Sequence, residues 1–152
     1  MQTKRGFSFV ELLVVLAVIA IILAVAIPYI RSFRLEGVET MVAKEMQTVA
    51  TAQVQYHSQF GHYAPSLAAL GPPARGGVDR PDAAHLIPAS LASGEKNGYT
   101  YVLAVTSAGY TLNANPKVFG ASGRRTFYLD QDGIVHQNWG QDPASADSPE
   151  FK

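Results

Sequence analysis

A long apolar run near the amino end constrains this chain most. Leu12 to Ile30 carries no charge over 19 residues, which in a helix spans roughly 28 Å, close to the roughly 30 Å thickness of a bilayer's hydrocarbon core. Lys4 and Arg5 precede the run, and basic residues favour the cytoplasmic side of a membrane. The sequence therefore predicts a membrane segment with its amino end inside and everything after Arg31 exported.

One acidic residue, Glu11, stands at the start of this apolar segment, five residues after Gly6. A charged side chain at the centre of a bilayer costs roughly 2.5 to 3.5 kcal/mol by insertion scales. Such a residue is therefore expected to have a partner of opposite charge.

Two general interpretations of the amino end are open. A secretory signal also has a basic start and an apolar stretch, and Ala24-Val25-Ala26 offers a cleavage site that would leave Ile27 first. Its apolar region is normally only about 7 to 15 residues long, however. An uncleaved signal anchor explains the length of the run but leaves Gly6 and Glu11 unexplained.

The stretch Gly6-Phe7-Ser8-Phe9-Val10-Glu11, followed by the apolar run, resembles the leader junction of type IV pilins and of their relatives, the type II secretion pseudopilins. The resemblance implies that residues 1–6 are a leader, that a prepilin peptidase cuts between Gly6 and Phe7, and that the new amino group of Phe7 is methylated. It also implies assembly by inner-membrane machinery into a filament of identical or related subunits.

Cleavage after Gly6 would create a cationic amine on Phe7, about one helical turn from Glu11. In a stack of identical helices, Glu11 of one subunit can pair with the Phe7 amine of the next; the alternative is a pair within one subunit. Because removing one partner of a buried ion pair costs roughly 3 to 5 kcal/mol, an intermolecular pair would fix the register of the subunits.

Pro28 lies near the end of the apolar run and lacks a backbone N–H, so we expect a helix kink there. In the pilin family a proline at this place coincides with a stretch that can lose helical structure in the filament. The resemblance implies the same for the residues just before Pro28.

Beyond the membrane run the helical pattern continues, with apolar residues at spacings of three, four or seven. This stripe comprises Leu35, Val38, Val42, Val49, Ala52, Tyr56 and Phe60, with Glu45 at the one position that should be apolar. The pattern predicts an amphipathic half of the same helix, residues 31–60, packed on the chain's own globular domain.

The remaining segments are a breaker-rich loop and a small sheet. Residues 61–98 contain Gly-Pro-Pro and Arg-Gly-Gly breakers and are predicted to connect helix and sheet with one or two helical turns. Strand patterns at 99–106, 110–114, 125–129 and 134–136 predict a four-stranded antiparallel sheet whose apolar face covers the helix stripe. The predicted segments are the leader 1–6, the transmembrane and filament-core helix 7–30, the amphipathic half 31–60, the connecting loop 61–98, the sheet 99–139 and a flexible tail 140–152.

Composition excludes several classes of function. The 12 basic and 12 acidic residues balance and there is no cysteine, so we expect no direct nucleic-acid binding and no disulfide in the exported domain. Asp130, Asp132 and Gly133 resemble the start of a calcium loop, but its twelfth position would be Gln141 where a glutamate is required, which favours a hairpin turn. We expect no metal site, no cofactor, no catalytic residues and no enzymatic activity.

The sequence thus predicts an α+β pilin fold, with a long amino-terminal helix packed on a small antiparallel sheet. The predicted function is that of a structural subunit of a type IV pilus-like filament, held in the bacterial inner membrane before assembly and extracellular afterwards. The alternatives are a pseudopilin of a type II secretion system and a monomeric membrane-anchored binding module of the envelope.

Overall fold

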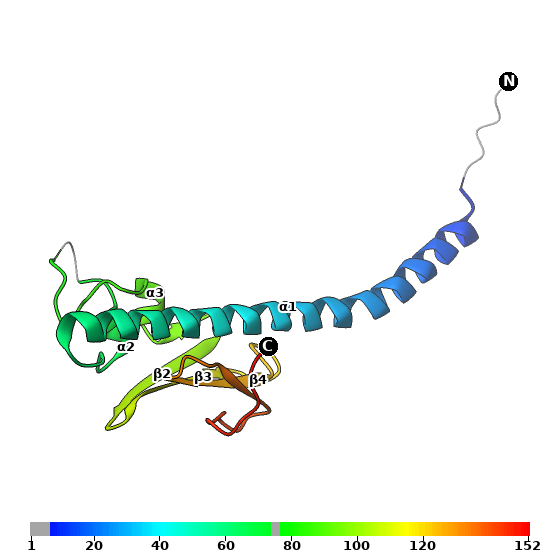
Figure 1. Cartoon of the computed structure of the whole chain (residues 1–152). Helices are drawn as coiled ribbons and strands as arrows, with labels where there is room; N and C mark the ends of the chain where they lie inside the picture. Colours follow the sequence, from blue (N-terminus) through cyan, green and yellow to red (C-terminus); the bar gives the residue numbers. More distant parts are fainter. Residues whose placement is uncertain (1–6, 74–76) are drawn as a thin grey trace. The chain divides into compact units, whose positions relative to one another are not determined.

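The computed structural model describes residues 7–73 and 77–152, so the predicted leader, including Gly6, lies outside the described residues. The chain divides into two compact units, Met1–Arg34 and Leu35–Lys152. Helix α1 (Phe9–Phe60) begins in the first unit and ends in the second (Figure 1). Pro28 lies inside α1, where it leaves one helical hydrogen bond unmade.

The second unit has the predicted α+β architecture, with the last part of α1 beside an antiparallel sheet (Figure 1). The strands follow chain order: β1 (Glu95–Lys96), β2 (Tyr99–Thr106), β3 (Gly109–Pro116), β4 (Arg125–Asp130) and β5 (His136–Trp139). The sheet has five strands where we predicted four. The additional strand, β1, pairs with β2 because Asn97 and Gly98 both have positive φ, 52° and 77°, as a two-residue hairpin turn requires.

The core lies between α1 and one face of the sheet. Of the predicted stripe, Val42, Val49, Ala52 and Tyr56 are buried, which confirms the helical pattern. Met46 is also fully buried, whereas Glu45 lies at the margin of the core, so the apolar position belongs to Met46. From the sheet, the fully buried side chains on this face are Tyr99, Leu112, Ala114, Phe127 and Leu129.

The connecting segment contains two short helices, α2 (Leu67–Leu70) and α3 (Ala89–Ala92). Ser66 caps α2, since its side chain accepts a hydrogen bond from the backbone N–H of Ala69 at 3.2 Å. Leu70 and Leu91 bury the apolar side of these helices in the core. The segment is therefore packed against the domain at these two points, as the apolar pieces in the sequence indicated.

The carboxy-terminal segment differs from the expected flexible tail. Residues 141–148 lie over the outer face of the sheet, where Asn113 and Thr126 donate hydrogen bonds to the carbonyls of Ala144 and Asp142. Further on, the backbone N–H of Phe151 donates to the carbonyl of Val135 at 2.8 Å, and its ring packs edge-on against Phe127. Backbone carbonyls of this Asp, Ala and Ser sequence thus accept hydrogen bonds from polar side chains of the sheet's outer face.

The last strand, β5, starts later than predicted. We placed Ile134 in the last strand, but β5 begins at His136 and Ile134 is 44% exposed. Asp130 explains the turn: its side chain accepts from the N–H of Asp132 at 3.0 Å and its carbonyl from the N–H of Gly133 at 3.1 Å. Because this turn extends to Ile134, the next residue, Val135, enters the core instead.

Candidate assembly site

The predicted junction lies at the start of α1. Phe7 is 79% exposed, and the carbonyl of Ser8 accepts the hydrogen bond of the Leu12 N–H at 3.2 Å. Glu11 is therefore in the first turn of the helix, where the unpaired backbone N–H groups favour a negative charge. Within the described part of the chain Glu11 has no ion-pair partner. Its partner in the predicted charge pair, the Phe7 amine, would exist only after cleavage.

The first unit presents an unusual amount of apolar surface. The exposed side chains include Leu12, Val14, Leu16, Ile21, Ile22, Val25, Ile27 and Ile30, each between 48% and 71% exposed. Among the described residues, α1 is the one helix that is long and apolar enough to cross a membrane. Since contiguous apolar surface of this extent marks a membrane or protein interface, this segment is the candidate assembly surface.

Glu39 joins α1 to the sheet within the second unit. Its side chain is fully buried, and one carboxylate oxygen accepts from the backbone N–H of Arg124 at 2.7 Å. The other oxygen, Oε2, lies 3.2 Å from Nε of Arg125. This pair is an ion contact rather than an aligned hydrogen bond, because neither atom has a partner of suitable hydrogen-bond geometry among the described residues.

Arg125 is held by further groups on the same face of the sheet. Its Nη1 donates to Oε1 of Gln137 at 2.9 Å, and its guanidinium lies 4.0 Å from the ring centre of Trp139. The pairing of Arg125 with Trp139 across β4 and β5 brings these side chains together. The buried carboxylate of Glu39 therefore meets a preorganised cation.

Glu45 makes a second polar attachment, between α1 and the β1–β2 hairpin. Its carboxylate accepts from Lys96 at 2.8 Å, from the Asn97 amide at 3.0 Å and from the hydroxyl of Tyr101. Burial, and next the hydrogen bond to Glu45, raise the pKa of Tyr101 far above its usual range. The tyrosine therefore remains a proton donor at all physiological pH values.

The sequence did not predict either polar attachment, although a signal for the first was present. Glu39, Val42, Met46, Val49, Gln53 and Tyr56 follow spacings of three and four without interruption, and all six are buried. Extending the stripe by this rule would have selected Glu39 and Gln53 as buried polar residues. Gln53 holds the end of the helix, because its amide donates to the carbonyl of Ala64 at 3.2 Å and accepts from its N–H at 2.8 Å.

The described residues contain no group of three or more His, Cys, Asp or Glu side chains arranged to hold a metal ion. The turn that contains Asp130 and Asp132 is held by its own hydrogen bonds. The geometry around Glu39 and Glu45 is that of attachment between helix and sheet. The chemistry of the candidate site thus lies in the exposed apolar helix and its single acid.

Comparison with known proteins agrees with this interpretation of the amino end. Residues 1–27 match the family model for the prokaryotic N-terminal methylation motif. The amino end of the chain thus carries the motif of type IV prepilins, which supports the resemblance to type IV pilins. The chain is 34% identical over 70 residues to the type IV wide pilus major component PilA4 of Thermus thermophilus.

The match to this pilin covers 46% of the chain and 53% of the relative, so the chain spans about half the length of the curated relative that it matches. No solved structure gave a significant match. The long amino-terminal helix packed on an antiparallel sheet is the α+β, pilin-like architecture that the sequence predicted.

Proposed function

We propose that this pilin-like protein is a structural, non-enzymatic subunit of a type IV pilus-like filament. The observation that carries the proposal is the junction Gly6-Phe7 with Glu11, followed by a helix whose apolar side chains are exposed. The methylation motif over residues 1–27 supports processing of this junction. A prepilin peptidase would remove residues 1–6 and the amine of Phe7 would then be methylated.

Before assembly, the first part of α1 would anchor the chain in the inner membrane with the second unit outside the cytoplasm. Assembly machinery in that membrane would then transfer the helix from lipid into the core of a filament. Both environments are apolar, so the exposed aliphatic side chains between Leu12 and Ile30 would be covered in each. The missing helical hydrogen bond at Pro28 makes the residues before it the expected place for a kink or local unwinding.

Glu11 would provide the register of assembly by accepting the Phe7 amine of an incoming subunit. The described residues offer Glu11 no cation, and an unpaired carboxylate in an apolar core is costly. The Phe7 amine of a neighbouring subunit removes this cost only when the two helices are staggered so that the amine lies beside Glu11. The pair would therefore favour a single helical stagger between subunits.

The test is to replace Glu11 and measure assembly separately from insertion. In Glu11→Ala cells, membrane insertion and leader cleavage should be unchanged, because neither step uses the charge pair. The subunit in the sheared surface fraction should fall at least about tenfold, since an uncompensated buried amine costs several kcal/mol for each added subunit. Glu36→Ala is the matched control, because Glu36 is an exposed acid on the same helix. Wild-type filament yield from Glu11→Ala would exclude the intermolecular pair.

A further inference from the structure

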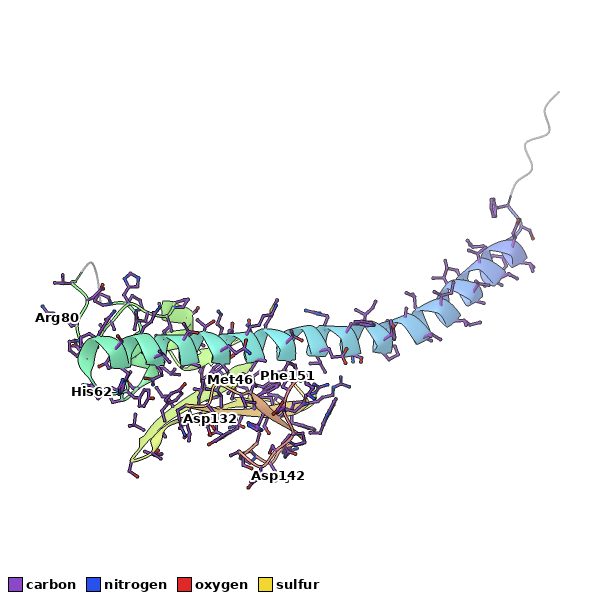
Figure 2. All side chains as sticks on the ribbon, in the orientation of Figure 1. Met46, His62, Arg80, Asp132, Asp142 and Phe151 are labelled. Carbon is purple, nitrogen blue, oxygen red and sulfur yellow. The ribbon has the colours of Figure 1, made fainter. Side chains whose placement is uncertain are left out.

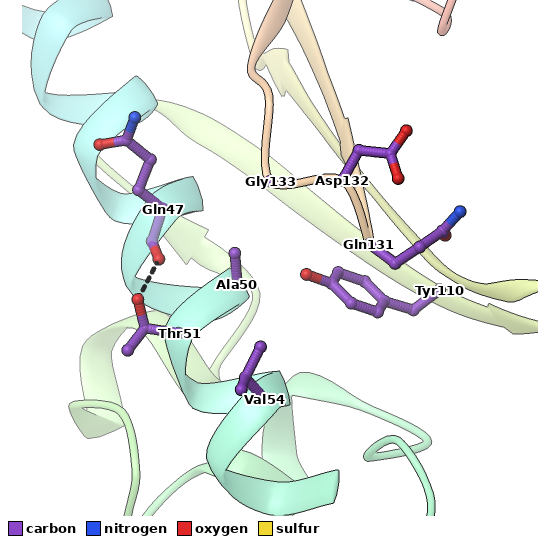
Figure 3. A pocket seen from close by; sticks show the side chains of 8 residues that line it. All are labelled: Gln47, Ala50, Thr51, Val54, Tyr110, Gln131, Asp132 and Gly133. Atoms are coloured by element: carbon purple, nitrogen blue, oxygen red, sulfur yellow. Dashed lines mark hydrogen bonds between the residues drawn. The ribbon is translucent and has the colours of Figure 1, made fainter.

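A groove of about 470 Å³ runs between α1 and the turn that joins β4 to β5, within the second unit (Figure 3). Gln47, Ala50 and Val54 of α1 form one side, and Tyr110 and Asp132 lie on the other. Val54 is 63% exposed although it is a large apolar side chain. The groove therefore combines an apolar side with polar groups, and its polar groups have unused bonding capacity.

Tyr110 is the first of these groups. The residue is only 1% exposed, yet its hydroxyl makes no hydrogen bond to any residue that the structure describes, and Figure 3 shows this hydroxyl pointing across the groove towards α1. Burial, with smaller effects of Tyr63 and Asp130, raises the pKa of Tyr110 to about 12. This hydroxyl is not among the buried polar atoms that lack a partner, so it faces the open groove, where it is protonated and can donate to a group that enters.

The second group is the acidic turn. Asp132 is exposed at the rim, and Asp130 lies two residues before it. Neither carboxylate forms an ion pair with a described residue, and the side chains that line the groove include no cation. A segment that fills the groove would therefore carry a cation for Asp132, an apolar side chain for Val54 and a carbonyl for Tyr110.

The chain itself contains a segment of this chemistry at another place on the domain. Val78 is 73% exposed, and Arg80 is exposed without a carboxylate partner among residues 7–73 and 77–152. Two backbone hydrogen bonds to Ala83, of 3.1 and 2.9 Å, hold Arg80 in place. Figure 2 shows Arg80 and Asp132 on different parts of the domain. Val78 and Arg80 are two residues apart and both exposed, so one short segment presents both side chains.

We propose that the groove beside Val54 and Asp132 receives the Val78–Arg80 segment of a second copy of this chain. The inference rests on the proposed filament function and identifies a subunit contact within it. Because groove and segment are different surfaces of one domain, the contact is head-to-tail and each copy uses both surfaces. A contact of this kind can propagate without closing, as a helical filament requires.

Cysteine crosslinking tests the contact in assembled filaments. The chain contains no cysteine, so the double variant Val54→Cys with Val78→Cys introduces the only thiols. Under mild oxidation, sheared filaments should give a ladder of disulfide-linked multimers on a non-reducing gel, because a disulfide requires the two Cβ atoms to be about 3.5 to 4.5 Å apart. The matched control is Val54→Cys with Val118→Cys, since Val118 is also exposed, at 60%. It should give no ladder, nor should either single variant.

A charge exchange tests the same contact without new thiols. Asp132→Arg and Arg80→Asp should each lower the filament yield several-fold, and the combined variant should restore it. Filaments that form normally but give no ladder from Val54→Cys with Val78→Cys overturn this contact and leave the proposed function intact. A ladder from the control pair, or a crosslink from Val54→Cys to a different protein, overturns it as well. Absence of the chain from wild-type filaments would instead contradict the proposed function.

Discussion

Removal of the Glu39 carboxylate should destabilise the second unit, Leu35–Lys152, more than any change at a surface acid. In Glu39→Ala, the largely buried guanidinium of Arg125 loses the counter-ion 3.2 Å away, and the N–H of Arg124 loses its acceptor. Breaking a buried ion pair from one side costs roughly 3 to 5 kcal/mol. The lower end applies here, because the Arg125 side chain is 14% exposed and keeps Gln137 and Trp139 as partners.

A loss of about 3 kcal/mol corresponds to a fall in Tm of about 10 °C for a domain of this size. The assay is thermal unfolding, followed by circular dichroism, of the fragment that starts at Arg31. Since this fragment lacks the membrane run and keeps the buried stripe, we expect a soluble monomer with helix and sheet. Glu36→Ala is the control and should change the stability by no more than about 0.5 kcal/mol.

The double variant Glu39→Met with Arg125→Met separates an uncompensated charge from a general loss of packing. Replacing both partners of a buried pair with apolar side chains is often neutral, so the double variant should regain most of the Tm that Glu39→Ala loses. A fall of less than about 3 °C for Glu39→Ala would refute the reasoning. A double variant that is less stable than Glu39→Ala would also refute it.

Two further predictions concern glycine positions and a buried tyrosine of the domain. A Cβ at Gly123 would overlap the hydroxyl and ring of Tyr99, a fully buried side chain, so Gly123→Ala should lower the Tm of the domain. A Cβ at Gly37 meets no atom within 4 Å. Gly37→Ala should therefore raise the free energy of unfolding by about 0.5 to 1 kcal/mol, because alanine favours the helix over glycine. The pKa of Tyr110 is raised from 10.0 to about 12 in the folded chain, so the unfolded chain loses this proton first and the free energy of unfolding should fall as the pH rises from about 10 to about 12. In urea titrations across that range the fall should be shallower for Tyr110→Phe, and an equal slope would contradict the assignment.

The elements that the sequence predicted best are those with a local, repeated pattern. The spacing of Val42, Val49, Ala52 and Tyr56 indicated which side of the helix is buried, and the alternation from Tyr99 to Thr106 matched β2. The methylation motif was also readable, because its signal is local, and the family model matches it over residues 1–27; cleavage between Gly6 and Phe7 stays a prediction. The helix stripe and the strand alternation depend on the helical and strand periods alone.

Contacts between residues far apart in the sequence were beyond such patterns. Glu39 and Arg125 are 86 positions apart (125 minus 39), and the sequence of α1 alone does not name the partner of a buried acid. The tail was misjudged for a related reason: Asp, Pro and Ser residues suggested disorder, while its order comes from Asn113 and Thr126 on the sheet. The strand β1 was missed because two residues are too few to show an alternation.

The most direct test of the proposed function is the mass of this subunit in filaments sheared from the cell surface. The account predicts that the filaments contain the chain, that it begins at Phe7, and that it carries one additional methyl group on its amino terminus. Tandem mass spectrometry of the amino-terminal peptide places that methyl group. The account is contradicted if the chain is absent from the sheared filaments, if it retains Met1 to Gly6, or if it begins at Ile27.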